Sequence, residues 1–195
     1  MAAAVGDQKP INRVSAWLAR AETVLVFVSS LAMASIMLVL MADVVLRYVF
    51  NAPLVWSYDL IGLYLIGAVF FLALPDTMQQ HGHIALDVFV PLFPRRPRHA
   101  AQSLGFGIST LLLAAITWLE YGEALDAFVA DDRIAGVIPF QTWVAHAVLT
   151  VGMGVLVLRC AYRTFFHAVS AISGRDSVEM PPPPITSTHS TEHAE

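Results

Sequence analysis

The distribution of apolar and charged residues divides the chain into four long apolar runs. No Asp, Glu, Lys or Arg occurs in residues 23–42, 60–75, 100–119 or 134–158. Crossing a hydrocarbon layer of about 30 Å takes about 20 residues of helix. The second run reaches that length when it is extended to residues 57–77, with Asp59 and Asp76 near its ends. The pattern therefore predicts an all-α membrane protein with four transmembrane helices, at about 23–42, 57–77, 100–119 and 134–158.

The composition supports this class and excludes others. Hydrophobic residues make up 57% of the chain and charged residues 13%, compared with about 25% charged residues in a soluble domain. Too few charges are present to cover a soluble globular enzyme. The net charge of −4 gives no basic surface for nucleic acid. The single cysteine, Cys160, excludes an internal disulfide.

The basic residues predict how the four helices are oriented. Nine of the eleven Lys and Arg residues fall on one side if all four runs cross the membrane. These nine are Lys9, Arg13, Arg20, Arg95, Arg96, Arg98, Arg159, Arg163 and Arg175. Positive charge collects on the cytoplasmic side, so both termini are expected in the cytoplasm. The expected division is a cytoplasmic segment over 1–22, a transmembrane domain over 23–173 and a disordered proline-containing tail over 174–195.

The segment after the first run holds candidate interaction residues. Asp43 and Arg47 are spaced so that they can pair on one helix face. The pair either ends the first helix at the interface or fixes the geometry of a contact with another protein. The aromatic residues over 47–59 predict a short element lying on the outer membrane surface.

Ionisable residues inside a membrane are the usual indication of function. The middles of the predicted helices contain none except His146, which is expected to hydrogen-bond a neighbouring helix, with proton relay or ligand binding as the alternative. His81, His83 and Asp87 could suggest a metal site, but a fourth ligand is missing, so a polar helix entry is preferred. No cofactor or metal is predicted. The small residues Ala101, Gly105 and Ser109 recur every four positions and indicate close helix packing, within the bundle or against a partner.

Two motifs in order carry a family resemblance. Residues 43–87 read DVVLRYVFNAPLVWSYDLIGLYLIGAVFFLALPDTMQQHGHIALD. This stretch resembles the small membrane subunit of tripartite ATP-independent periplasmic (TRAP) transporters. The matching residues are Arg47, Tyr48, Phe50, Asn51, Pro53, Trp56 and Ser57, followed by Gly82, His83, Ile84 and Asp87. Asp59 departs from the family pattern, which usually has glutamate there, and Gln79 and Gln80 replace a basic pair.

The resemblance implies a role as a partner subunit in a bacterial inner membrane. In such systems a periplasmic binding protein captures an organic anion, often a carboxylate, and a large multi-span permease imports it with a sodium gradient. The small subunit would stabilise and anchor the permease within the membrane lipid, without catalysis. The expected partner contacts are Asp43, Arg47, Asn51, Trp56 and Asp59 on the outer side, with His83 and Asp87 at the cytoplasmic turn. A self-sufficient small carrier or a redox subunit acting through His146 is the alternative.

Overall fold

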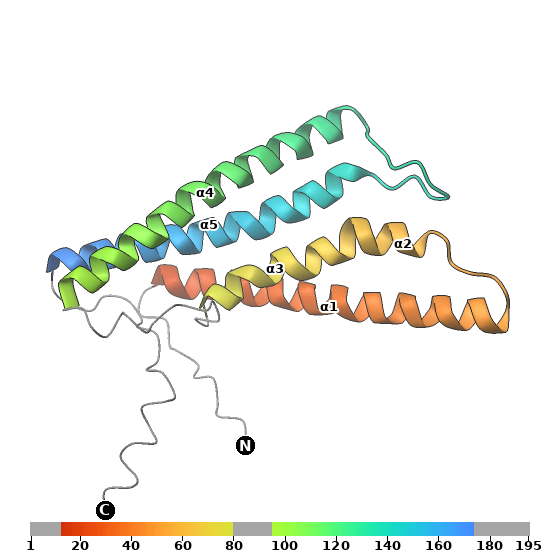
Figure 1. Ribbon diagram of the computed structural model, residues 1–195, viewed down its shortest axis with the longest axis horizontal. Helices are drawn as coiled ribbons and strands as arrows, with labels where there is room; N and C mark the ends of the chain where they lie inside the picture. Colours follow the sequence, from red (N-terminus) through yellow and green to blue (C-terminus); the bar gives the residue numbers. More distant parts are fainter. Residues whose placement is uncertain (1–12, 80–94, 174–195) are drawn as a thin grey trace, which may run out of the picture.

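The computed structural model describes residues 13–79 and 95–173, which form long helices that alternate in direction (Figure 1). Helix α1 covers Arg13–Val49, α4 covers Arg95–Val129 and α5 covers Thr142–Ser173. Between α1 and α4, the helix α2 (Ser57–Leu60), the π-helical turn η1 (Ile61–Leu65) and α3 (Ile66–Gln79) follow one another without a break.

Four helical segments are long and apolar enough to cross a membrane, which confirms the predicted four-span, all-α class for the described residues. They are Val14–Val49, Ser57–Met78, Ala101–Val129 and Thr142–Ile172. We call the end that carries residues 50–56 and 130–141 the loop end. The opposite end, where α1 and α4 begin and α3 and α5 end, is the terminal end (Figure 1).

The fourth helix begins later than its apolar run. Residues 134–141 lie outside α5 because this segment folds back on itself. The Ile134 N–H donates to the Phe140 carbonyl at 2.9 Å, and the Thr142 N–H donates to the Asp132 carbonyl at 3.1 Å. Pro139 cannot donate a backbone hydrogen bond, which disfavours a helix interior here. The expected start at residue 134 is therefore corrected to Thr142.

Two other helices extend beyond their uncharged runs. Helix α1 begins ten residues before residue 23 and ends seven residues after residue 42. Helix α4 continues ten residues past Leu119, so Glu120, Glu123 and Asp126 lie on the helix and not in the connection. Charged residues therefore interrupt the apolar pattern without ending the helix. Residues 174–195 lie outside the described part of the chain.

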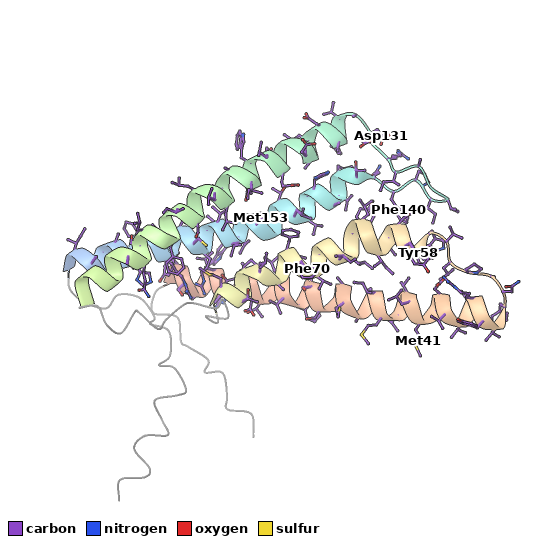
Figure 2. All side chains as sticks on the ribbon, in the orientation of Figure 1. Met41, Tyr58, Phe70, Asp131, Phe140 and Met153 are labelled. Atoms are coloured by element: carbon purple, nitrogen blue, oxygen red, sulfur yellow. The ribbon has the colours of Figure 1, made fainter. Side chains whose placement is uncertain are left out.

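The helices pack as a row, in the order α4, α5, α3 and α1 (Figure 1). Helices α3 and α5 meet in the centre, while α1 and α4 form the two outer sides. The outer helices consequently expose much apolar surface, including Trp17, Phe27 and Leu111. Met41 points from α1 away from the other helices (Figure 2). In a membrane this surface is available to lipid or to another protein.

The inward face of α1 is unusually polar. Ser15, Glu22, Ser29 and Asp43 are all buried. They are separated by seven, seven and fourteen residues, which is close to two, two and four helical turns. Ser29 donates a hydrogen bond to the Val69 carbonyl of α3 at 2.9 Å. Helix α1 therefore points these four polar residues at its neighbours, together with the buried apolar residues Leu18 and Ala32.

The closest backbone approach in the centre involves Gly152 of α5. A Cβ at this position would overlap the Phe71 carbonyl group of α3 and lie 3.2 Å from the Leu72 nitrogen. Only a residue without a side chain fits here. The stripe of Ala101, Gly105 and Ser109, in contrast, is exposed, so it does not mediate packing among the described helices.

We predict that Gly152→Ala separates α3 from α5 and destabilises the fold by about 1–3 kcal/mol, since the new methyl group meets backbone and not a mobile side chain. Gly154→Ala is the matched control, because a Cβ there enters open space. Thermal unfolding in mild detergent measures both. Equal midpoints for the two variants would show that the α3–α5 crossing does not depend on this contact.

Candidate functional site at the loop end

The end of α1 and the start of α2 are joined by one polar network. Arg47 Nη2 donates to Asp43 Oδ2 at 2.6 Å and to the Tyr58 hydroxyl oxygen at 2.7 Å. The second oxygen of Asp43, Oδ1, accepts the Leu54 N–H at 2.7 Å. Asp43 is buried, whereas the Arg47 side chain is 42% exposed. The carboxylate thus holds the connection against α1, and the guanidinium retains a surface for an external partner.

Asn51 produces the turn that makes this network possible. Its φ angle of 52° lies in the left-handed region, where asparagine is tolerated better than most residues and where helices commonly end. The Leu46 carbonyl accepts the N–H groups of Phe50 and Ala52, each at 3.1 Å. Asn51 therefore has a conformational role that accounts for its position without a partner.

Trp56 and Asp59 lie beside the network and are half-buried. Asp59 is in the first turn of α2, where a carboxylate complements the helix dipole. A Cβ added at Gly136 would lie 3.0 Å from Asp59 Oδ2, so Asp59 packs against the 130–141 segment. The lack of a side chain at Gly136 allows this approach.

A second contact ties the two loop segments together. The Tyr64 hydroxyl of η1 donates to the Gln141 carbonyl at 2.6 Å, and its ring meets Phe140 edge to face at 5.7 Å. In Figure 2, Tyr58 and Phe140 lie at this end of the molecule, on the two sides of the site. The loop end thus forms one connected surface made from α1, α2, η1 and the 130–141 segment.

The structure therefore brings Asp43 and Arg47 together as the sequence spacing predicts. It adds Tyr58, whose hydroxyl is a second Arg47 partner that the sequence analysis missed. Only its aromatic character near the interface signalled Tyr58. His81, His83 and Asp87 lie outside the described residues, so the expectations for them remain untested.

Buried charge also occurs at the terminal end. Arg159 Nε of α5 lies 3.1 Å from Glu22 Oε1 of α1, and both side chains are almost fully buried. Arg159 Nη1 also donates to Ser15 Oγ at 3.5 Å. Nearby on the same face of α5, the Arg163 guanidinium lies 5.6 Å from the Phe106 ring centre, and His167 stacks on that ring at 5.6 Å.

His146 contacts a neighbouring helix, as predicted. Its Nδ1 lies 2.9 Å from Glu120 Oε2 of α4. Glu22 and Glu120 each lie one residue outside the predicted spans, yet both lie well inside the helices that the structure shows. The membrane-spanning helices of the structure, Val14–Val49 and Ala101–Val129, are longer than the predicted spans and therefore include Glu22 and Glu120 in addition to the predicted ranges. Each of these three groups has a charged or titratable partner within the chain.

Comparison with known families decides between the possible roles of such a bundle. Residues 36–170 match the family described as tripartite ATP-independent periplasmic transporters, DctQ component. The chain belongs to the DctQ family. DctQ proteins are multi-pass components of transporters in the inner membrane and are not enzymes. No match is found among curated proteins.

The family match places the loop-end site within DctQ sequence. Asp43, Arg47 and Asp59 all fall inside residues 36–170, as does Arg159. Glu22 and Ser15 precede the matched range. The α1 side of the terminal-end ion pair is thus a feature of this DctQ chain beyond the family match.

We predict that Asp43→Ala loosens the connection after α1. The change leaves the Leu54 N–H and the Arg47 guanidinium without their acceptor, at a cost of about 1–3 kcal/mol. Limited proteolysis should then cleave residues 50–56 faster than in the unmodified protein. Arg133→Ala, which removes an exposed ion pair with Asp131, is the control. Indistinguishable cleavage in the two variants would contradict the assigned role of Asp43.

Proposed function

We propose that this chain is the small scaffold subunit that stabilises and anchors the large permease of a TRAP transporter, which imports organic anions such as carboxylates with a sodium gradient. The observation that carries this proposal is the pairing of its carboxylates. Glu22, Asp43 and Glu120 each have a partner within the chain. A carboxylate that couples transport to an ion gradient must exchange its partner during the cycle. Here Glu22 and Glu120 join neighbouring helices, and Asp43 holds the connection after α1.

The arrangement of the helices supports the same role. A row of four helices has two outer sides that other hydrophobic surfaces can cover, and α1 and α4 present their apolar faces there. The substrate path and its selectivity then belong to the large permease, and the binding protein delivers the organic anion. The small subunit contributes membrane area and rigidity.

We propose further that the terminal end faces the cytoplasm. The starts of α1 and α4 at this end carry Arg13, Arg20, Arg95, Arg96 and Arg98, while Arg47 and Arg133 lie at the loop end. The positive-inside rule favours this orientation. The loop end would then face the periplasm, where the binding protein approaches.

At the loop end, Arg47, Asn51, Trp56 and Asp59 are proposed to form a partner contact, with Asp43 holding Arg47 in place. Arg47 supports this assignment best, because it is fixed by two acceptors and still exposed. An exposed cation held in one geometry loses less conformational entropy when it binds an acidic group. His83 and Asp87 are proposed to set the cytoplasmic turn.

Assembly is tested by co-purification. The tagged chain should retain a large multi-span permease in mild detergent when the two are produced together, because their apolar faces meet within the membrane. A soluble binding protein from the same system should not be required for this association. Recovery of the tagged chain alone, from membranes that contain the permease, would exclude the scaffold role.

Arg47→Ala should reduce substrate uptake by roughly fivefold or more, as expected when a charged contact contributes about 1–3 kcal/mol. Uptake of a radiolabelled carboxylate into cells or proteoliposomes measures the effect. Arg133→Ala is the matched control, since Arg133 is an exposed arginine at the same end that pairs with Asp131. Full uptake with Arg47→Ala would remove Arg47 from the partner contact.

A further inference from the structure

The ion pair between Glu22 and Arg159 is the polar contact that joins α1 to α5 at the terminal end. Elsewhere α1 packs mainly on α3, and α5 packs on α3 and α4. The Glu22 side chain is 0% exposed and the Arg159 side chain 3% exposed. The pair is thus sealed between the first and last helices of the bundle.

One arginine contacts α1 at two heights. Arg159 lies 3.1 Å from Glu22 and 3.5 Å from Ser15, and these two residues are seven positions apart. Seven residues correspond to about 10 Å along a helix axis. A rotation of α1 about its axis, or a shift by one turn, would break at least one of these contacts. Arg159 therefore defines both the rotation and the height of α1.

Apolar packing alone would define this arrangement poorly. In a membrane, lipid tails are as apolar as leucine, so no hydrophobic force selects which face of a helix meets its neighbour. The outward face of α1 carries Val24, Phe27 and Leu31, which could pack against α5 as well as the residues now facing it. The buried polar residues of α1 therefore determine which face of the helix meets α5.

Such a pair is better suited to specificity than to stability. Removing two charges from a polar environment costs about as much as their attraction returns, so apolar replacement of a whole buried pair is often neutral for stability. Loss of one partner, in contrast, leaves an uncompensated buried charge. A variant that replaces both residues tests whether the pair selects one arrangement of α1 on α5. A variant that replaces one residue tests how much stability depends on the pair.

We infer that the Glu22–Arg159 pair is a positioning element that fixes α1 on α5 and thereby presents the outer face of α1 to the large permease. The inference rests on the assembly proposed above. The same placement forms an apolar groove of about 630 Å³ between the two helices, which is lined by Leu18 on α1 and Leu158 on α5 among others.

The groove provides a direct readout of the arrangement. Leu18→Cys and Leu158→Cys, in a Cys160→Ser background, place two thiols on opposite walls for a short bifunctional maleimide. The full chain is produced with and without the permease. Four forms are compared: the unmodified pair, Arg159→Met alone, Glu22→Met with Arg159→Met, and the exchanged pair Glu22→Arg with Arg159→Glu. Asp131→Asn with Arg133→Gln, an exposed pair, is the control.

We expect the double methionine form to keep the thermal midpoint of the unmodified protein but to lose cross-linking and bound permease by roughly tenfold. The exchanged pair should recover most of both, and the exposed-pair control should change neither. Arg159→Met alone should lose stability as well. If the exchanged pair recovers both signals, the charge pairing itself positions α1. If apolar packing were the requirement instead, the double methionine form would give the stronger signals.

Wild-type cross-linking and permease binding in the double methionine form would overturn the inference, as would failure of the exchanged pair to recover either signal. The cross-link is measured in the isolated chain too, so it tests the pair independently of the partner. If the unmodified chain binds no permease while the cross-link follows the predicted pattern, the proposed function fails and the positioning of α1 on α5 stands.

Discussion

The absence of water in the hydrocarbon layer is the constraint on which the structure depends. A polar side chain in that layer must find a partner on another helix or carry a free-energy cost of several kcal/mol. Within α1, Glu22 and Ser29 meet this requirement through contacts with α5 and α3. Ser15 and Asp43 lie nearer the two ends of the helix and contact α5 and the segment after α1. These contacts run from one end of α1 to the other. Their common face determines which side of α1 is the inside.

The apolar exterior of the bundle follows from this orientation of α1. With its polar residues turned inward, α1 presents Trp17, Phe27 and Met41 to the surroundings, and α4 does the same on the opposite side of the row. A bundle that exposes apolar residues and pairs its charges internally is suited to enlarging the membrane-embedded part of an assembly. The DctQ membership gives that assembly its identity as a transporter. Arg47 at the loop end is paired with Asp43 and yet keeps 42% of its side chain exposed.

The sequence predicted the helices because their signal is long and local. Uncharged runs over 100–119 and 23–42 exceed what any soluble helix requires, and the spacing of Asp43 and Arg47 places both side chains on one face. What could not be predicted depended on contacts between distant segments. The Arg47–Tyr58 hydrogen bond requires the turn at Asn51, and the start of α5 depends on a backbone pairing within residues 132–142.

Glu22 is the clearest example of a contact that could not be predicted from the sequence. It lies one residue before the first uncharged run, so a boundary based on charge excludes it from the membrane helix. Its partner Arg159 lies one residue after the fourth run, 137 positions away. The recurrence of Ser15, Glu22, Ser29 and Asp43 at multiples of seven residues was the available signal, but a search for apolar stripes does not detect it. In this membrane helix, the polar residues and not the apolar ones indicate which face is turned inward.

A photo-cross-linking scan along α1 in the assembled transporter tests the central claim most directly. A photoreactive amino acid would replace, one at a time, inward Ser15 and Ser29 and outward Val24, Phe27 and Met41. The account predicts that the inward positions form products only within the chain, whereas the outward positions capture lipid or the large permease. Capture of the permease from Ser15 or Ser29, with internal products from the outward positions, would contradict it.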